Sequence, residues 1–267
     1  MIEIIGYVLS ILIGISLGLI GGGGSILTVP ILVYVFGLSA EISTSYSLFI
    51  VGITALAGSL NYYRNKLVNM KVAVIFSIPS LTAVFFTRKF IMPALPEIIF
   101  TIGNYQFTRS MLILTLFAAL MIAASISMIR KGKIKDPSAE NSGHHYTLIF
   151  LEGIIVGMLT GFVGAGGGFL IIPALVLFAG LPMKEAVGTS LLIIAVKSLI
   201  GFTGDISAGV KIDWMFLFLV SFFTVSGIYI GSSLAKKIPG EKLKPAFGWF
   251  VLVMGIYILL RETILKS

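Results

Sequence analysis

The sequence contains no cysteine, only two histidines and few charged residues for its length. The absence of cysteine excludes disulfides, thiolate metal sites and cysteine nucleophiles. Charged residues make up 11% of the chain, against about 25% in soluble globular domains. So few charges could not cover the surface of a soluble globule. The scarcity of charge therefore predicts an integral membrane protein that contacts the lipid bilayer.

Apolar sequence is abundant. Of the 267 residues, 57% are hydrophobic, and the mean hydropathy is +1.07. At about 20 residues per span, the chain can hold about ten spans at most, which leaves no room for a separate soluble domain. The net charge of +8 fits the enrichment of Lys and Arg in the cytoplasmic loops of membrane proteins. We therefore expect no nucleic-acid partner.

Apolar stretches separated by polar residues predict an all-α, polytopic membrane protein with about 8–10 hydrophobic helical segments. A polar linker, RKGKIKDPSAENSGHH, divides them into two groups of five. Its adjacent histidines are weak evidence for metal, and we expect neither a metal site nor a cofactor. The predicted segments are 4–20, 25–37, 43–62, 71–88, 110–129, 147–163, 168–180, 187–204, 213–235 and 246–260.

The two halves share a sequence pattern at a separation of 143 residues. Residues 14–58 align without a gap to 157–201, with 16 identities in 45 pairs. Many identities are glycines, and one is a proline, which shared hydrophobicity does not explain. The alignment predicts a first transmembrane repeat at 1–129, a polar linker at 130–146 and a second transmembrane repeat at 147–267. Such duplication is typical of secondary transporters.

The distribution of basic residues favours inverted repeats over parallel ones. If each half crosses the membrane an odd number of times, twelve of the eighteen Lys and Arg residues in loops or at segment ends lie on one side. If each half crosses four times, the split is ten to eight. The positive-inside rule favours the first arrangement. We therefore expect a multi-pass protein of the cell membrane with a cytoplasmic linker.

Each half carries a glycine-rich motif, GLIGGGGSILTVP at 18–30 and GFVGAGGGFLIIP at 161–173. Consecutive glycines weaken a helix, and irregular backbone is tolerated in a membrane only where protein or water covers it. Each motif predicts a broken or re-entrant helix whose free amides bind an anion, although close helix packing is an alternative. The predicted substrate-binding residues in the motifs are Gly21, Gly22, Gly23, Gly24, Ser25, Gly164, Gly166, Gly167 and Gly168.

Lys197 lies near the centre of an apolar segment, where a charge is costly and normally faces a partner or a water-filled cavity. It is the predicted cationic contact for an anionic substrate, and a structural ion pair is the alternative. The hydroxyls of Ser47, Thr189 and Ser190 are further candidate donors, although such groups often only join helices. Glu152 is a candidate proton relay, although a carboxylate about one turn inside a segment more often simply reaches the membrane interface.

Three other charged residues are expected at the membrane surface. Arg88 and Lys89 close a predicted span and are expected to anchor it at the lipid headgroups, while Asp205 ends another span and is expected at the interface.

The glycine motifs resemble those of the TauE/SafE family of sulfite exporters and related permeases. The second copy keeps the pattern as Gly164-Ala165-Gly166-Gly167-Gly168 followed by Pro173, and Thr189-Ser190-Leu191 also matches the family. The first copy departs from it at Ser25 and Tyr46. The resemblance covers nearly the whole chain and implies a secondary transporter of small sulfur-containing oxyanions, such as sulfite, sulfonates or thiosulfate.

We therefore expect alternating access around a site at the membrane midplane, with a small anion as substrate and a proton or sodium as a possible coupling ion. The oligomeric state is left open. An anion channel could use the same residues. An intramembrane enzyme would need a base beside its nucleophile, and Lys197 and Ser198 are adjacent in sequence, so their side chains diverge on a helix.

Overall fold

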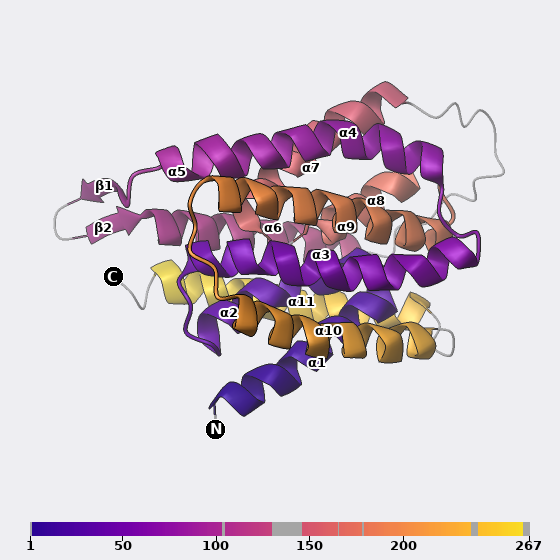
Figure 1. Cartoon of the computed structure of the whole chain (residues 1–267), viewed down its shortest axis with the longest axis horizontal. Coiled ribbons are helices and arrows are strands. Elements are labelled where there is room, and N and C mark those ends of the chain that lie inside the picture. The colour runs from indigo at the N-terminus through magenta and orange to yellow at the C-terminus, as the bar shows by residue number, and fades with distance from the viewer. Residues whose placement is uncertain are drawn as a thin grey trace.

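The computed structural model describes residues 2–102, 105–129, 146–164, 166–177, 179–235 and 240–263. Long helices lie along a common direction (Figure 1), and most of the predicted linker falls outside the described residues. The helices are α1 (Ile2–Ile20), the 3₁₀ helix η1 (Gly21–Leu27), α2 (Thr28–Tyr34), α3 (Ala40–Arg64), α4 (Met70–Phe86), the π-helical turn η2 (Thr87–Ile91), α5 (Met92–Ala94), α6 (Arg109–Ile129), α7 (Tyr146–Val163), α8 (Gly168–Leu177), α9 (Met183–Ser207), α10 (Trp214–Ala235) and α11 (Gly240–Thr263).

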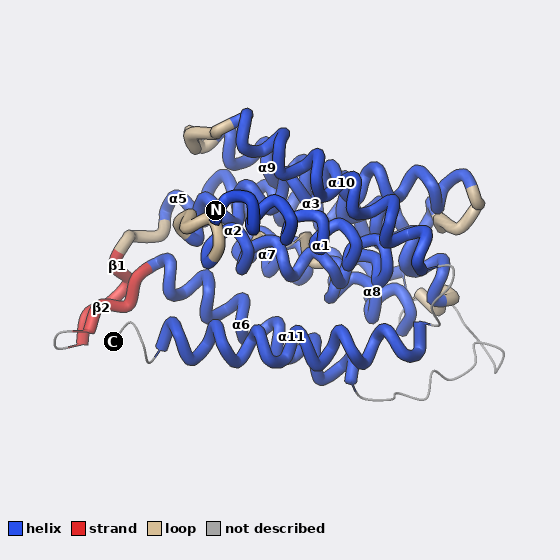
Figure 2. Tube along the Cα trace, turned by 90° about the horizontal axis from the view of Figure 1, so that it is seen from below, coloured by secondary structure: helices blue, strands red, loops and turns tan. Residues whose placement is uncertain are grey.

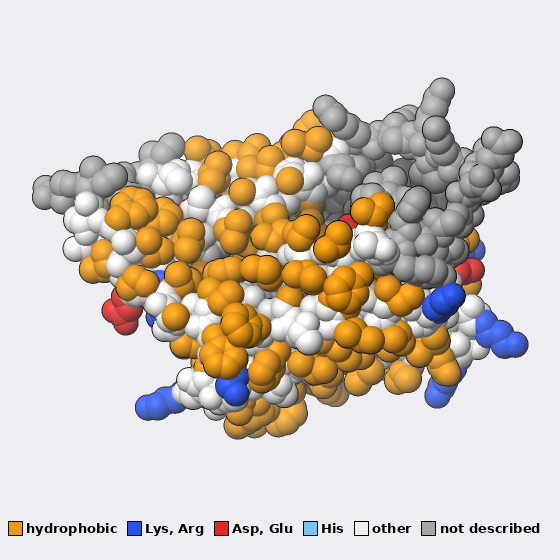
Figure 3. Space-filling model, turned by 90° about the horizontal axis from the view of Figure 1, so that it is seen from above, with side chains coloured by type: hydrophobic (Ala, Val, Ile, Leu, Met, Phe, Trp, Pro, Cys, Tyr) orange, Lys and Arg blue, Asp and Glu red, His pale blue; other side chains and the backbone are white. Residues whose placement is uncertain are grey.

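The predicted all-α membrane architecture is confirmed. Within the described ranges, five helices are long and apolar enough to span a membrane, and they lie at 40–64, 70–94, 109–126, 183–207 and 214–234. Hydrophobic side chains cover the middle of the face shown in Figure 3, while Lys and Arg gather toward its two ends. This distribution matches the apolar core and polar boundaries of a bilayer.

A β-hairpin between α5 and α6 was not predicted. Strands β1 (Ile98–Ile102) and β2 (Tyr105–Thr108) pair antiparallel, and they project from one end of the helical bundle (Figure 2). Their Ile, Phe, Tyr and Thr residues favour strands. We refer to this end, where α3 also begins, as the hairpin end, and to the opposite end as the linker end.

The first glycine motif reverses the chain inside the bundle. Gly21 has φ +70°, a conformation that glycine adopts without steric cost. Beyond it, Gly24 packs against Leu17, and the ring centroids of Tyr7 and Phe36 lie 5.6 Å apart. Therefore α1 and the η1–α2 arm form a hairpin that begins and finishes at the hairpin end.

The second glycine motif makes a matching hairpin from the linker end. Gly164 also has φ +70°, and α8 then returns along the bundle. Ile149, near the start of α7, lies in the same buried cluster as Leu175 and Ala179, near the end of α8 and just after it. The two hairpins therefore enter the bundle from opposite ends.

The hairpins meet in the interior, between α3 and α9. The backbones of Gly22 and Gly168 are in contact, so no side chain separates the two motifs. Helices α3 and α9 pack antiparallel beside them, because Gly52 faces Leu199 while Gly58, farther along α3, faces Leu191.

Corresponding elements in the two halves share their bounds at the separation of 143 residues. Both ends of α3 and α9 match in this way. The positive-φ residues that match are the pairs Gly21 and Gly164, Gly37 and Gly180, and Lys66 and Gly209. Since α3 and α9 are antiparallel, two such repeats would be inverted. This agreement supports the predicted duplication, which stays a prediction.

The contact between the Gly22 and Gly168 backbones, where the two hairpins cross, predicts the effect of one added methyl group. Gly168→Ala should destabilise the protein by about 1–3 kcal/mol, because its β-carbon would overlap the backbone of Gly22. The matched control is Gly255→Ala on α11, where the β-carbon would lie 3.1 Å from side chains of α6. We expect the control to stay within about 1 kcal/mol of the parent. Thermal unfolding in detergent measures both, and an unchanged Gly168→Ala melting temperature would contradict the crossing.

Candidate functional site

The residue at the centre of the candidate site is Lys197. It lies in α9, with fourteen helical residues before it and ten after it, and its side chain is 0% exposed. A β-carbon on Gly167, in the second glycine motif, would lie 2.9 Å from its Nζ atom. The ammonium group is therefore held against the second motif.

The Lys197 ammonium has no hydrogen-bond partner in the described part of the chain. Its helix neighbours Ile193, Ile194 and Ala195 are fully buried and apolar, so they offer nothing to satisfy the charge. The ion pairs found among the described residues are Arg88 with Asp205 and Arg109 with Glu41. An unpaired buried ammonium is strongly disfavoured, and a bound anion or water would relieve this cost.

Backbone donors lie close to this ammonium. Helix α8 has ten residues and begins at Gly168. The amides of Leu170 and Ile171 donate to the Gly167 carbonyl at 3.0 and 3.1 Å, which leaves the first two helical amides, those of Gly168 and Phe169, without partners within the helix. Just before it, Gly166 and Gly167 have φ +66° and +70°. Consecutive amides in such turns can form a concave anion site. The second motif therefore combines a helix N-terminus with an adjacent positive charge.

The first glycine motif differs from this arrangement. Residues Gly21–Leu27 form a 3₁₀ helix that continues into α2. The Ser25 hydroxyl donates to the Gly22 carbonyl at 2.7 Å, so this polar group is already satisfied within the motif. Gly22 contacts Gly168 and the side chain of Ile194. The structure therefore gives the first motif a role in packing, and its predicted anion contacts at Gly21, Gly22, Gly23, Gly24 and Ser25 stay predictions.

The hydroxyl of Ser47 lies on a helix face that covers the second motif. Thr44 contacts Gly164, and Val51 contacts Gly166. Since residues three and four apart share a helix face, Ser47 lies between these two contacts. Its Oγ atom is buried and has no hydrogen-bond partner among the described residues, so it is free to bind a ligand.

Ser190 holds the equivalent position on α9, because Val187 contacts Gly21 and Ile194 contacts Gly22. Its hydroxyl donates to the Val187 carbonyl at 2.8 Å, so it is already used within the helix. Ser198, next to Lys197, lies closer to the second motif: a β-carbon on Gly166 would be 3.4 Å from its Oγ atom.

Two predicted residues lie away from Lys197. Thr189 is eight residues earlier in α9, about 12 Å along the helix, and its hydroxyl accepts the amide hydrogen bond of Asn69 at 2.9 Å. Glu152 lies eight residues before Thr160, the residue of α7 that packs against Gly167. The structure thus does not gather them at the Lys197 centre, and their predicted roles stay untested.

Arg88 and Asp205 differ from the sequence expectation. Both were expected at the membrane surface, yet their exposed fractions are 2% and 3%. Arg88 comes from η2 and Asp205 from the end of α9, and the Arg88 Nη1 atom lies 3.5 Å from the Asp205 Oδ2 atom. One feature of the sequence could have indicated that Arg88 is buried: it lies among aromatic residues, in FFTRKF.

The comparisons with known proteins cover almost the whole chain. A probable membrane transporter protein of Xylella fastidiosa is 31% identical over 94% of this chain and 92% of its own length. Probable membrane transporter proteins of Bacillus subtilis (YdhB) and Methanocaldococcus jannaschii are 26% and 27% identical, over 93% and 95% of this chain and 96% and 94% of their own lengths. No solved structure matches. Residues 7–258 match the family described as sulfite exporter TauE/SafE, and the chain therefore belongs to the TauE/SafE family.

Proposed function

We propose that this protein is a secondary transporter of small sulfur-containing oxyanions, such as sulfite, sulfonates or thiosulfate. Membership of the TauE/SafE family and the names of its relatives as probable membrane transporters support transport in general. The observation that carries the choice of an anion is the fully buried ammonium of Lys197, which lies beside the second glycine motif and has no hydrogen-bond partner among the described residues.

The substrate site is formed by groups that already converge. Lys197 provides the positive charge, the first two amides of α8 donate hydrogen bonds to the oxyanion, and Ser47 and Ser198 add hydroxyl donors. A sulfur oxyanion can accept several hydrogen bonds at once. It therefore satisfies an ammonium group and several neutral donors within one small volume.

Alternating access takes place around this site through the two hairpins. They enter from opposite ends and touch at Gly22 and Gly168, so rocking of one half against the other opens the centre to one end at a time. This movement matches transporters built from inverted repeats. The repeats are 1–129 and 147–267, and the linker lies on the cytoplasmic side of the cell membrane, as the excess of basic residues at the linker end supports.

Removing the Lys197 charge should abolish transport. In proteoliposomes loaded with thiosulfate or sulfite, we expect Lys197→Ala to reduce saturable uptake or efflux at least about 100-fold, since desolvated charge contacts are each worth several kcal/mol. The control is Lys184→Ala, which removes an exposed lysine at the start of the same helix and should transport normally.

The same assay distinguishes a transporter from an anion channel. A transporter gives flux that saturates with substrate, whereas a channel gives electrodiffusive flux that follows the membrane potential. Parent-level flux in Lys197→Ala would overturn the site, and unsaturable flux in the parent protein would favour the channel.

Lys197→Met should raise the melting temperature of the unliganded protein while removing anion binding. Methionine keeps much of the side-chain volume without the buried charge, so we expect stabilisation of about 1 kcal/mol or more. Saturating thiosulfate should stabilise the parent by RT ln(1 + [L]/Kd) and leave Lys197→Met unchanged. Destabilisation of this variant would instead favour a structural ion pair for Lys197.

A further inference from the structure

Arg88 is a second buried cation outside the Lys197 centre. It lies in η2, the π-helical turn between α4 and α5, and is 2% exposed. Single π-helical turns are rare and frequently occur at functional sites. A charge buried this deeply normally has its hydrogen bonds satisfied.

The partners of Arg88 use only part of its guanidinium group. Its Nη1 atom donates to the Thr44 hydroxyl at 3.1 Å and lies 3.5 Å from one oxygen of Asp205. Its Nε and Nη2 atoms have no hydrogen-bond partner in the described ranges. These two atoms form the edge of a guanidinium that can bind an oxyanion through two parallel hydrogen bonds.

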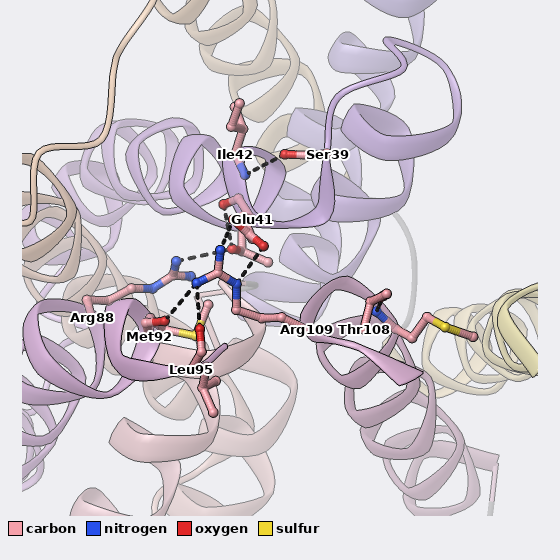
Figure 4. A network of polar contacts seen from close by, with 10 residues as sticks. Ser39, Glu41, Ile42, Arg88, Met92, Leu95, Thr108 and Arg109 are labelled. Carbon is pink, nitrogen blue, oxygen red and sulfur yellow. Dashed lines mark hydrogen bonds and ion pairs between the residues drawn. The ribbon is translucent and has the colours of Figure 1, made fainter. Parts of the chain in front are cut away.

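Arg109 shows what a satisfied arginine looks like at the same end of the bundle. Its Nε and Nη2 atoms donate to the two carboxylate oxygens of Glu41 at 2.7 and 2.8 Å, and its Nη1 atom donates to the Leu95 carbonyl at 2.9 Å. Figure 4 shows Arg88 and Arg109 approaching the first turn of α3 from separate helices. The edge that Glu41 fills on Arg109 is left open on Arg88.

Arg88 and Lys197 lie beside the same hairpin, the one that contains the second glycine motif. Gly164, in the turn of that hairpin, packs directly against Thr44. A β-carbon added to Gly204 would lie 3.0 Å from the β-carbon of Arg88. Lys197 precedes Asp205 by eight residues in α9, about 12 Å along the helix. Arg88 therefore lies between the Lys197 centre and the hairpin end.

Among the described residues, the corresponding positions of the other half carry no equivalent charged group. The positions 143 residues from Thr44 and Asp205 are Val187 and Tyr62, whose side chains cannot pair with an arginine in this way. At these described positions the polar contacts of Arg88 are therefore not a structural feature repeated in both halves.

We propose that Arg88 is a second binding position for the transported oxyanion, between Lys197 and the hairpin end. This inference rests on the proposed function. The anion binds the Nε and Nη2 edge, while the Thr44 hydroxyl, which donates to the Glu41 carbonyl at 2.9 Å, keeps its contact with Nη1. Asp205 competes with the anion for the same guanidinium, which keeps binding weak and promotes release toward the hairpin end.

The competition gives a test based on tighter binding. The full-length protein is titrated with thiosulfate and with sulfite in detergent, with chloride as the ion control. Asp205→Asn removes the competing carboxylate and should lower the dissociation constant at least threefold. Adding Arg88→Met should abolish this gain. Lys89→Met, which removes the neighbouring charge packed near Phe85 and Phe90, should leave affinity unchanged.

A second comparison separates this position from the Lys197 site. The variant Lys197→Ala/Asp205→Asn should still bind thiosulfate through Arg88. The variant Arg88→Met/Asp205→Asn should still bind thiosulfate through Lys197, but the rate at which it transports thiosulfate should fall at least tenfold. The paired variant removes both charges together, which avoids leaving one of them buried alone.

Two results would overturn the proposal. One is a dissociation constant for Asp205→Asn no lower than that of the parent. The other is parent-level transport by Arg88→Met/Asp205→Asn, which would give the ion pair of Arg88 and Asp205 a structural role. This second result decides the question if Asp205→Asn does not fold. If either result is found and Lys197→Ala also loses anion binding, the proposed function is retained and only the second binding position is rejected. Absence of binding in the parent would overturn both.

Discussion

The contact between Gly22 and Gly168 is the constraint on which the interior depends. Two stretches of backbone can meet inside a membrane only if neither carries a side chain at the contact and other protein covers their polar groups. Helices α3 and α9 supply that cover, each against the glycine motif of the other half. The same crossing holds Gly167 against Lys197, so the central charge and the broken backbone share one location.

Several buried polar groups that have no hydrogen-bond partner among the described residues lie near the second hairpin. Lys197, Ser198, Ser47 and the open edge of Arg88 lie within apolar clusters that supply the packing. A protein selected only for stability would replace such groups with apolar ones, which often costs nothing or stabilises the fold. Their presence suits a protein that must bind a hydrated anion, replace its water and release it again.

The sequence predicted the helices well because hydrophobic length is a local property, and it predicted the burial of Lys197 because a charge in an apolar run has few alternatives. It did not predict the β-hairpin, the burial of Arg88 with Asp205 or the use of Thr189 to accept the Asn69 amide. Each of these depends on which distant segments become neighbours. A pattern of spacing within one segment does not contain that information.

The packing of the first glycine motif has a consequence for how the protein is made. Its glycine turn is covered by Val187, Ile172 and Gly168, all of which are synthesised long after it. During biogenesis the amino-terminal half must therefore wait at the translocon, or in a provisional arrangement, until the carboxyl-terminal half has been inserted. Assembly of the native interior is then a late, concerted step, and separately expressed halves need one another to mature.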